Sequence, residues 1–187
     1  MQIIRPKHDF PVGTLPYFYL VGPVLGAGDW QHTMCRALEQ VVDDCIIATP
    51  TRWNDSHPLA SRFVGTMGTY ESQTHWEQAY IERALTGPMS CVVSYLASED
   101  PRNPRTDGKP FGIDTYGEMN YFRGRLEGSG PHSRSQFRLA LGVHPNYPYW
   151  KTLKKNLDYS YGGAFPYSES ISRLAEEAKR MVEKETR

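Results

Sequence analysis

The sequence predicts an α/β fold: a three-layer sandwich in which helices cover both faces of a central, mainly parallel sheet of four to five strands. Four apolar runs indicate the sheet, because a strand that is buried on both faces shows a continuous apolar run instead of polar alternation. Amphipathic segments alternate with these runs, and that order is typical of parallel strands. The 187 residues contain no internal repeat or composition shift, so we expect one domain spanning 1–187.

The four predicted strands are short runs of aromatic, β-branched and aliphatic residues. The first run ends at Gly22 and Pro23, which cannot continue a regular buried strand. Each of the other runs is also followed by turn-forming residues. The predicted strands cover residues 17–24, 45–50, 90–97 and 136–143.

The predicted helices have apolar residues at helical spacing. Asp29 is suited to cap the first helix, and Gly87 with Pro88 ends the second. The third is expected to start at Thr115, with Asp114 as its cap. The predicted helices cover residues 30–43, 73–85, 115–125, 147–157 and 168–185. The long polar stretch 51–72 is expected to be a functional loop or a partly structured lid.

Composition excludes several classes of protein. Lys and Arg total 21, as do Asp and Glu, so the chain lacks the basic excess of most nucleic-acid-binding and membrane-surface proteins. The N-terminus lacks the apolar core of a signal peptide, and no apolar run approaches the ~18 residues of a membrane span. The three cysteines, an odd and scattered set, are expected to be reduced and buried. We therefore expect a cytoplasmic protein that binds neither nucleic acid nor membranes.

Common catalytic and cofactor motifs are missing. The segment GPVLGAG is neither a P-loop nor a dinucleotide-binding fingerprint, and no GxSxG elbow occurs. The six histidines show no metal-ligand spacing. We therefore expect no metal and no organic cofactor.

Carboxylates near the predicted strand ends are the strongest catalytic candidates. Ligands of such sheets bind beyond the carboxyl ends of the strands, where Glu118 and Asp114 follow the third strand. Glu77 lies near the start of the helix before that strand. Paired carboxyl groups about 5 Å apart are the apparatus of retaining glycosidic cleavage. A structural alternative exists for each: Glu118 as a helix-start carboxylate, Glu77 as a solvated residue and Asp114 as a helix cap.

Five motifs, in their order and spacing, resemble the nucleoside 2-deoxyribosyltransferase family, particularly its broader transferase-like branch. They cover roughly residues 17 to 145: YFYLVGPVLGAGDWQ, PTRWND, SQTHWEQAYIERAL, SCVVSYLA and GIDTYGEMNYF. The resemblance implies a flavodoxin-like or Rossmann-like fold.

The resemblance also implies roles for individual residues. Glu118 corresponds to the nucleophilic glutamate, although GEMNY stands here where the family commonly has ELG. Tyr19 corresponds to the tyrosine that hydrogen-bonds the nucleophile; a buried structural tyrosine is the alternative. Glu77 stands where the best-known members have an Asp near the base and sugar. Asp114 corresponds to the acidic residue that binds the sugar hydroxyls, at a shorter spacing than in those members.

Further candidate substrate ligands lack a matching family motif. Trp30 or Trp53 could stack on a base, and we expect at least one of them to face the pocket. The glycines that start at Gly22, with the next helix N-terminus, could hold a 5′-phosphate, although no Arg or Lys is adjacent. Three further candidates for the base or the sugar are Gln31, Arg52 and Asn54.

Together these features predict an enzyme that transfers 2-deoxyribose between nucleobases through a glycosyl-glutamate intermediate. Its ligands would be a nucleoside or nucleotide and a free nucleobase. The closest alternative is an N-glycoside hydrolase, and the second is a non-catalytic nucleotide-binding module. The family often completes its site from a neighbouring subunit, so the resemblance also implies a homo-oligomer, with HPNYPYW as a candidate contributing region.

Overall fold

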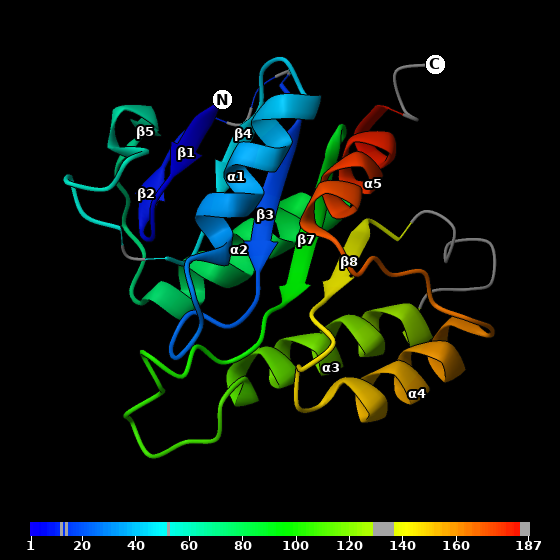
Figure 1. Cartoon of the computed structure of the whole chain (residues 1–187). Coiled ribbons are helices and arrows are strands. Elements are labelled where there is room, and N and C mark those ends of the chain that lie inside the picture. Colours follow the sequence, from blue (N-terminus) through cyan, green and yellow to red (C-terminus); the bar gives the residue numbers. More distant parts are fainter. Residues whose placement is uncertain (12, 14, 52, 129–136, 184–187) are drawn as a thin grey trace.

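The computed structural model shows the predicted α/β sandwich (Figure 1). The structure describes residues 1–11, 13, 15–51, 53–128 and 137–183. Within these ranges, six parallel strands form the central sheet in the order β5-β1-β4-β3-β7-β8. The sheet is therefore larger than the four to five strands expected.

All four predicted strands are confirmed, and two short ones extend the sheet at one edge. The predicted strands are β3 (Tyr17–Val21), β4 (Ile46–Ala48), β7 (Ser90–Leu96) and β8 (Leu139–Val143). Every residue in them is buried, as continuous apolar runs predict. The additional strands are β1 (Gln2–Ile4) and β5 (Phe63–Val64).

The predicted helices are also confirmed, with small shifts at their ends. They are α1 (Trp30–Val41), α2 (Gln73–Thr86), α3 (Ile113–Gly128), α4 (Trp150–Tyr161) and α5 (Ile171–Glu183). Asp29 caps α1 as expected, because its side chain accepts the backbone N–H of His32. The expected cap at Asp114 is wrong: α3 begins at Ile113, so Asp114 lies inside the first turn and Glu118 in the second.

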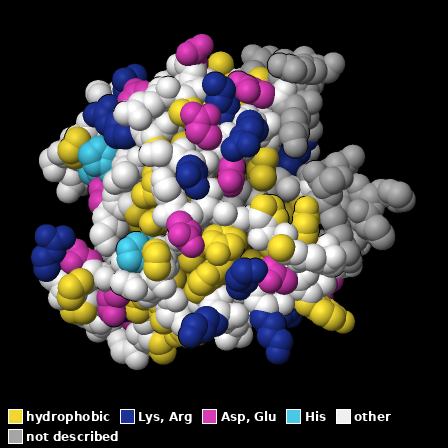
Figure 2. Space-filling model, turned by 45° about the vertical axis from the view of Figure 1, so that its right-hand side comes forward, with side chains coloured by type: hydrophobic (Ala, Val, Ile, Leu, Met, Phe, Trp, Pro, Cys, Tyr) yellow, Lys and Arg dark blue, Asp and Glu magenta, His cyan; other side chains and the backbone are white. Residues whose placement is uncertain are grey.

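The helices form the two outer layers. In Figure 1, α1 and α5 lie in front of the sheet and contact each other, whereas α2 lies behind it against β3 and β7. Helix α3 lies beyond the lower ends of β7 and β8 in this view and packs against α4. Acidic and basic side chains are interspersed over the face shown in Figure 2, in keeping with their balanced totals.

The polar stretch 51–72 is partly structured, as expected. It contains a short 3-10 turn (Ala60–Arg62), strand β5 and strand β6 (Thr66–Met67). Strand β6 pairs in the antiparallel direction with β2 (His8–Asp9) and forms a separate two-stranded sheet. This small sheet ties the stretch to the N-terminal segment.

The chain reverses its direction across the sheet at β3. It passes from β3 through α1 to β4 on one side, and later forms β7 on the other side of β3. In open parallel sheets such a reversal leaves a crevice at the carboxyl ends of the strands, where ligands bind. The candidate site is therefore sought between the segments that follow β3 and β7.

Two further observations concern the whole of the described chain. None of its helices has the length and hydropathy that a membrane crossing requires. The three cysteines, Cys35, Cys45 and Cys91, are free and buried, which confirms the expectation for them.

Candidate active site

A pocket of about 480 Å³ opens between α2 and α3. Its volume lies in the range of small-molecule sites. Two of the predicted catalytic residues, Glu77 on α2 and Glu118 on α3, line it. The lining residues are Thr74, Glu77, Gln78, Ile81 and Glu82 from α2 and Gly117, Glu118 and Tyr121 from α3.

Two contacts fix the position of Glu118. The neighbouring Met119 is fully buried, and its sulfur accepts the Ser94 hydroxyl of β7 at 3.4 Å. At the start of the helix, Gly112 has a positive φ of 72° and its carbonyl oxygen accepts the hydroxyl of Tyr147 at 3.0 Å. Because α3 is held against β7 and the segment before α4, the Glu118 carboxyl group is held at the pocket wall.

The surroundings of Glu118 favour its protonated form. Burial raises the pKa of this carboxyl group to about 8, and the negative charges of Glu77 and then Asp114 contribute to the same shift. Among the described residues, no cation forms an ion pair with Glu118. At neutral pH Glu118 therefore favours its neutral form beside the negative charge of Glu77, so one wall of the pocket can offer a carboxylic acid and the other a carboxylate, as glycosidic chemistry requires.

Glu77 is held by a side chain that sequence reasoning did not single out. The Gln73 amide nitrogen donates to Glu77 Oε1 at 2.8 Å and to the backbone oxygen of Pro50 at 3.1 Å. Gln73 lies four residues before Glu77, one turn along α2. That spacing is the only sequence signal that points to this contact.

Tyr19 lies close to both carboxyl groups, but it does not form the hydrogen bond expected with Glu118. Its hydroxyl is buried and has no hydrogen-bond partner within the described ranges. Burial raises the pKa of Tyr19 well above its usual value, and the charges of Glu77 and Glu118 raise it further. The ring packs against Trp76 at a centroid distance of 5.9 Å. A buried hydroxyl without a partner is a donor available to a ligand or to a displaced carboxylate.

Asp114 lies outside the pocket and is neutralised by cations. Its carboxylate forms an ion pair with Arg105 at 2.7 Å and a longer one with Lys109 at 3.8 Å. The Asp114 side chain is 63% exposed, whereas that of Arg105 is only 4% exposed. Arg105 also binds Asp107, whose pKa it lowers to about 2. Asp114 thus stabilises the loop before α3, and it influences Glu118 only through its charge.

Trp30 and Gly22 form a packing contact at the end of β3. Trp30 is buried, and its ring nitrogen donates to the backbone oxygen of Pro23 at 2.7 Å. A Cβ atom at position 22 would lie 2.5 Å from the Trp30 ring and 2.3 Å from the Tyr95 carbonyl oxygen. Gly22 is therefore required for this close approach, and neither residue lines the pocket.

The other predicted substrate ligands also lie away from the pocket. Gln31 is buried, and its amide nitrogen has no partner within the described ranges. Trp53 stacks on His57 with a centroid distance of 4.1 Å, so the expectation that Trp30 or Trp53 faces the pocket is not met for this pocket. Asn54 is exposed and accepts the backbone N–H and the hydroxyl of Ser56. Arg52 lies outside the described residues.

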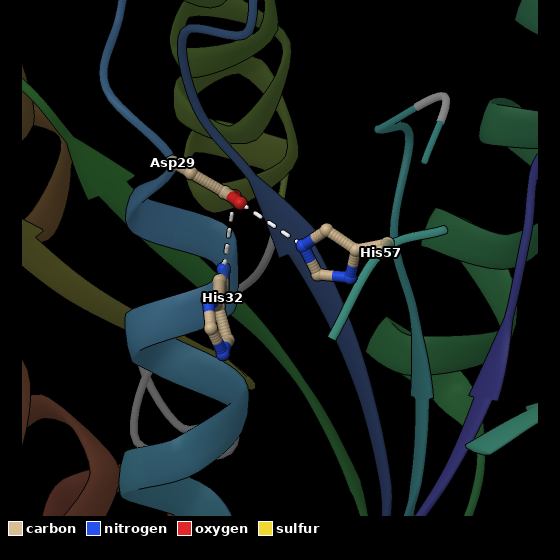
Figure 3. A group of neighbouring side chains, drawn as sticks. All are labelled: Asp29, His32 and His57. Carbon is tan, nitrogen blue, oxygen red and sulfur yellow. Dashed lines mark hydrogen bonds and ion pairs between the residues drawn. The ribbon is translucent and has the colours of Figure 1, made fainter. Parts of the chain in front are cut away.

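The fold brings together three potential metal ligands that the sequence spacing did not reveal. Ligand atoms of Asp29, His32 and His57 all lie within 4.8 Å of one another (Figure 3). However, His57 Nδ1 accepts the backbone N–H of Leu59 at 3.2 Å, which places the proton of a neutral ring on Nε2. Nε2 lies 3.1 Å from Asp29 Oδ2 and donates to it. This arrangement favours a hydrogen bond between His57 and Asp29 over a metal centre, because Nε2 would have to lose that proton to bind a metal.

Comparison with protein-family models and with curated proteins finds no match for this chain. A functional assignment therefore rests on the residues of the pocket and on the sequence motifs.

Proposed function

We propose that the protein transfers 2-deoxyribose between nucleobases by cleaving and re-forming the N-glycosidic bond of a 2′-deoxynucleoside. One observation carries this proposal: Glu118 and Glu77 line one pocket, where burial and the Glu77 charge raise the pKa of Glu118 to about 8. Glycosyl transfer with retention needs one carboxylate to attack the anomeric carbon and one carboxylic acid to protonate the leaving group. The preference for deoxyribose and nucleobases comes from the resemblance of the motifs.

In the proposed reaction, the proton of the pair moves from Glu118 to Glu77 when the substrate binds. The Glu118 carboxylate attacks C1′, and the C1′–N bond breaks as the base nitrogen takes the bonding electrons and the proton of Glu77. The product of this half-reaction is a deoxyribosyl ester of Glu118. A second base then attacks C1′, returns its N–H proton to Glu77 and releases Glu118 as a carboxylate.

Tyr19 is proposed to act on the ionised form of Glu118. Its hydroxyl is buried beside the pair without a partner in the described structure, so it can donate once Glu118 carries the charge. This hydrogen bond would lower the cost of moving the proton to Glu77. Tyr19 would thereby orient the nucleophile, as the family resemblance implies.

We also propose that the protein is a cytoplasmic homo-oligomer with its site near a subunit interface. The rim of the pocket includes the ring of Tyr121, which is 44% exposed and is suited to contact a second subunit. Three free thiols are in keeping with a reducing compartment. Light scattering of the eluting protein measures the subunit number, and a monomer that turns over would contradict this part of the proposal.

The test is chromatography of 2′-deoxynucleosides incubated with the protein, with and without a second free base. Glu118→Gln removes the nucleophile while keeping the side-chain shape. Glu176→Gln is the matched control, because Glu176 is an exposed glutamate on α5, on the other face of the sheet. We expect base exchange by the wild type and the control, and none by Glu118→Gln.

Other products would change the assignment. Free base and deoxyribose released without regard to an acceptor would identify a hydrolase. Binding of nucleosides without any turnover, unchanged in Glu118→Gln, would identify a non-catalytic binding module. Mass spectrometry of the protein after a short reaction without acceptor is expected to show one added deoxyribosyl group, on Glu118.

A further inference from the structure

The Gln73 side chain links the carboxyl pair to the segment that follows β4. Gln73 is the first residue of α2 and is half-buried behind the cap that Ser72 provides. Its amide nitrogen donates one hydrogen to the Pro50 backbone oxygen and one to Glu77 Oε1. An amide has two such hydrogens, so both are used. If the Gln73 amide were rotated by 180°, its oxygen would face the Pro50 and Glu77 oxygens, which cannot donate to it. The two contacts therefore determine the orientation of the amide.

The two carboxyl groups of the pocket differ in the hydrogen bonds that they accept. A hydrogen bond donated to a carboxylate favours its ionised form, and Glu77 receives one from Gln73. Glu118 receives none from the described residues, and it is desolvated beside the Glu77 charge. Both differences act in the same direction on the position of the shared proton.

We infer that Gln73 is a positioning residue that holds Glu77 as the ionised member of the pair, so that the single proton resides on Glu118 in the free protein. The hydrogen bond from Gln73 orients Glu77 and favours its ionised form. Gln73 does so while it is itself anchored to a neighbouring segment, through the Pro50 backbone oxygen.

The other titratable groups around Glu118 do not compete for this proton near neutral pH. Tyr19 from β3 and Tyr147 from the segment before α4 both interact electrostatically with Glu118, and burial raises the pKa of each phenol. Asp114, one turn earlier on α3, is paired with Arg105 and Lys109. The proton count of the site is therefore set by Glu77 and Glu118.

The catalytic meaning of this inference rests on the proposed function. If Glu118 is the nucleophile, its proton must reach Glu77 before attack, and Gln73 sets the energy of that transfer. Below the first apparent pKa of the pair both groups are protonated and Glu118 cannot ionise. A variant that weakens the Glu77 anion should therefore move the acidic limb of the kcat/KM profile to higher pH.

The test is an NMR titration of the glutamate carboxyl carbons in the free protein, which needs no substrate. Glu77→Gln and Glu118→Gln assign the two signals. Gln73→Met keeps the side-chain length but cannot donate, and Gln40→Met is the same change on an exposed glutamine of α1, on the other face of the sheet. Gln73→Glu is a second probe, because it replaces the amide that donates to Glu77 with a carboxylate.

In the wild type we expect Glu77 to titrate in the lower step and Glu118 in the upper one. Gln73→Met should raise the lower apparent pKa by about one unit, Gln73→Glu by more, and Gln40→Met should change neither step. If the wild-type Glu77 signal titrates in the upper step and the Glu118 signal in the lower one, the inference is overturned. This outcome does not depend on whether any Gln73 variant folds. A Gln73→Met protein with an intact amide spectrum and an unchanged titration would also overturn the inference. A protein that titrates as expected but exchanges no bases would instead contradict the proposed function alone.

Discussion

Asp114 and Glu118 lie one turn apart on α3, and their surroundings are opposite. Asp114 is mostly exposed and sits between two cations, Arg105 and Lys109. Glu118 faces a pocket beside a second carboxylate, and burial raises its pKa to about 8. The same helix thus carries one carboxylate that stabilises the fold and one that the fold holds in an unfavourable state. Such unfavourable placement is common at catalytic sites, because a shifted pKa suits proton transfer at neutral pH.

The largest difference between the two carboxylates is expected in turnover. Glu118→Gln should lower kcat/KM for base exchange by at least about 10³-fold, because it removes the oxygen proposed to bond to C1′. Asp114→Asn should lower it by less than about tenfold, since Asp114 acts on the site only through its charge. Steady-state kinetics of both variants measures the ratio, and equal losses would contradict the distinct roles.

The next largest difference is expected in the pH dependence of stability. Folded Glu118 keeps its proton to about pH 8, whereas its ordinary pKa is 4.5. Between these values the folded chain binds more protons than the unfolded chain, so the free energy of unfolding falls as pH rises and then levels off above about 8. Glu118→Gln removes this penalty and should stabilise the fold by about 2 to 4 kcal/mol at high pH and by almost nothing near pH 4.

Urea unfolding of wild type and Glu118→Gln across this range checks the sign. A variant that is less stable than the wild type at pH 8.5 would show that Glu118 is held in a favourable place. The catalytic interpretation would then lose its main physical support.

A third prediction tests how α3 is positioned. A Cβ atom at Gly112 would lie 2.9 Å from the Tyr147 ring, and the backbone there has a φ of 72°. Gly112→Ala should therefore destabilise the fold by about 2 kcal/mol and disturb both carboxylates. Gly124→Ala, at an open position on the same helix, should instead stabilise it by roughly 0.5 to 1 kcal/mol. Thermal unfolding of the two variants gives the comparison, and a shift of the same sign in both would contradict this account.

The smallest effect is expected from removing the charge of Asp114. Asp114→Asn breaks its ion pairs with Arg105 and Lys109 and should cost less than about 1 kcal/mol, because the pair is exposed on the aspartate side. It should also lower the pKa of Glu118 slightly, since the Asp114 charge contributes to raising it. This loss of stability is opposite in sign to the effect of Glu118→Gln. Added salt screens the ion pairs, so the difference in unfolding free energy between wild type and Asp114→Asn should be smaller in high salt.

The sequence was sufficient for the sheet core, and the physical reason is local. The strands β3, β4, β7 and β8 are buried on both faces, so their residues carry a continuous apolar pattern. Strands β1 and β5 were missed because runs of three and two residues are too short to show a period. Glu118 became a candidate because it follows a strand whose carboxyl end lies at the ligand-binding edge of a parallel sheet, and Glu77 because it lies near a helix start and matches a position of the resembled family.

Contacts between distant or separately packed segments were not predictable. The pairing of Arg105 with Asp114 depends on the path of an irregular loop, and the grouping of His57 with Asp29 joins segments 28 residues apart. Trp30 was one of two candidates for stacking on a base, but its ring packs against Gly22 and donates to the Pro23 backbone oxygen. In each of these cases the sequence identifies a side chain that can form a polar or aromatic contact, but the partner of that contact depends on how distant segments pack.

The buried hydroxyl of Tyr19 has a consequence for the evolution of this chain. A phenylalanine would fill the same space beside Trp76 without leaving a buried polar atom unpartnered. Selection for folding alone would therefore accept phenylalanine at position 19. If selection acts only on folding, descendants of this sequence should lose the hydroxyl readily. If it acts on the chemistry of the pocket, the hydroxyl should persist in every descendant that keeps Glu118, and both should disappear together.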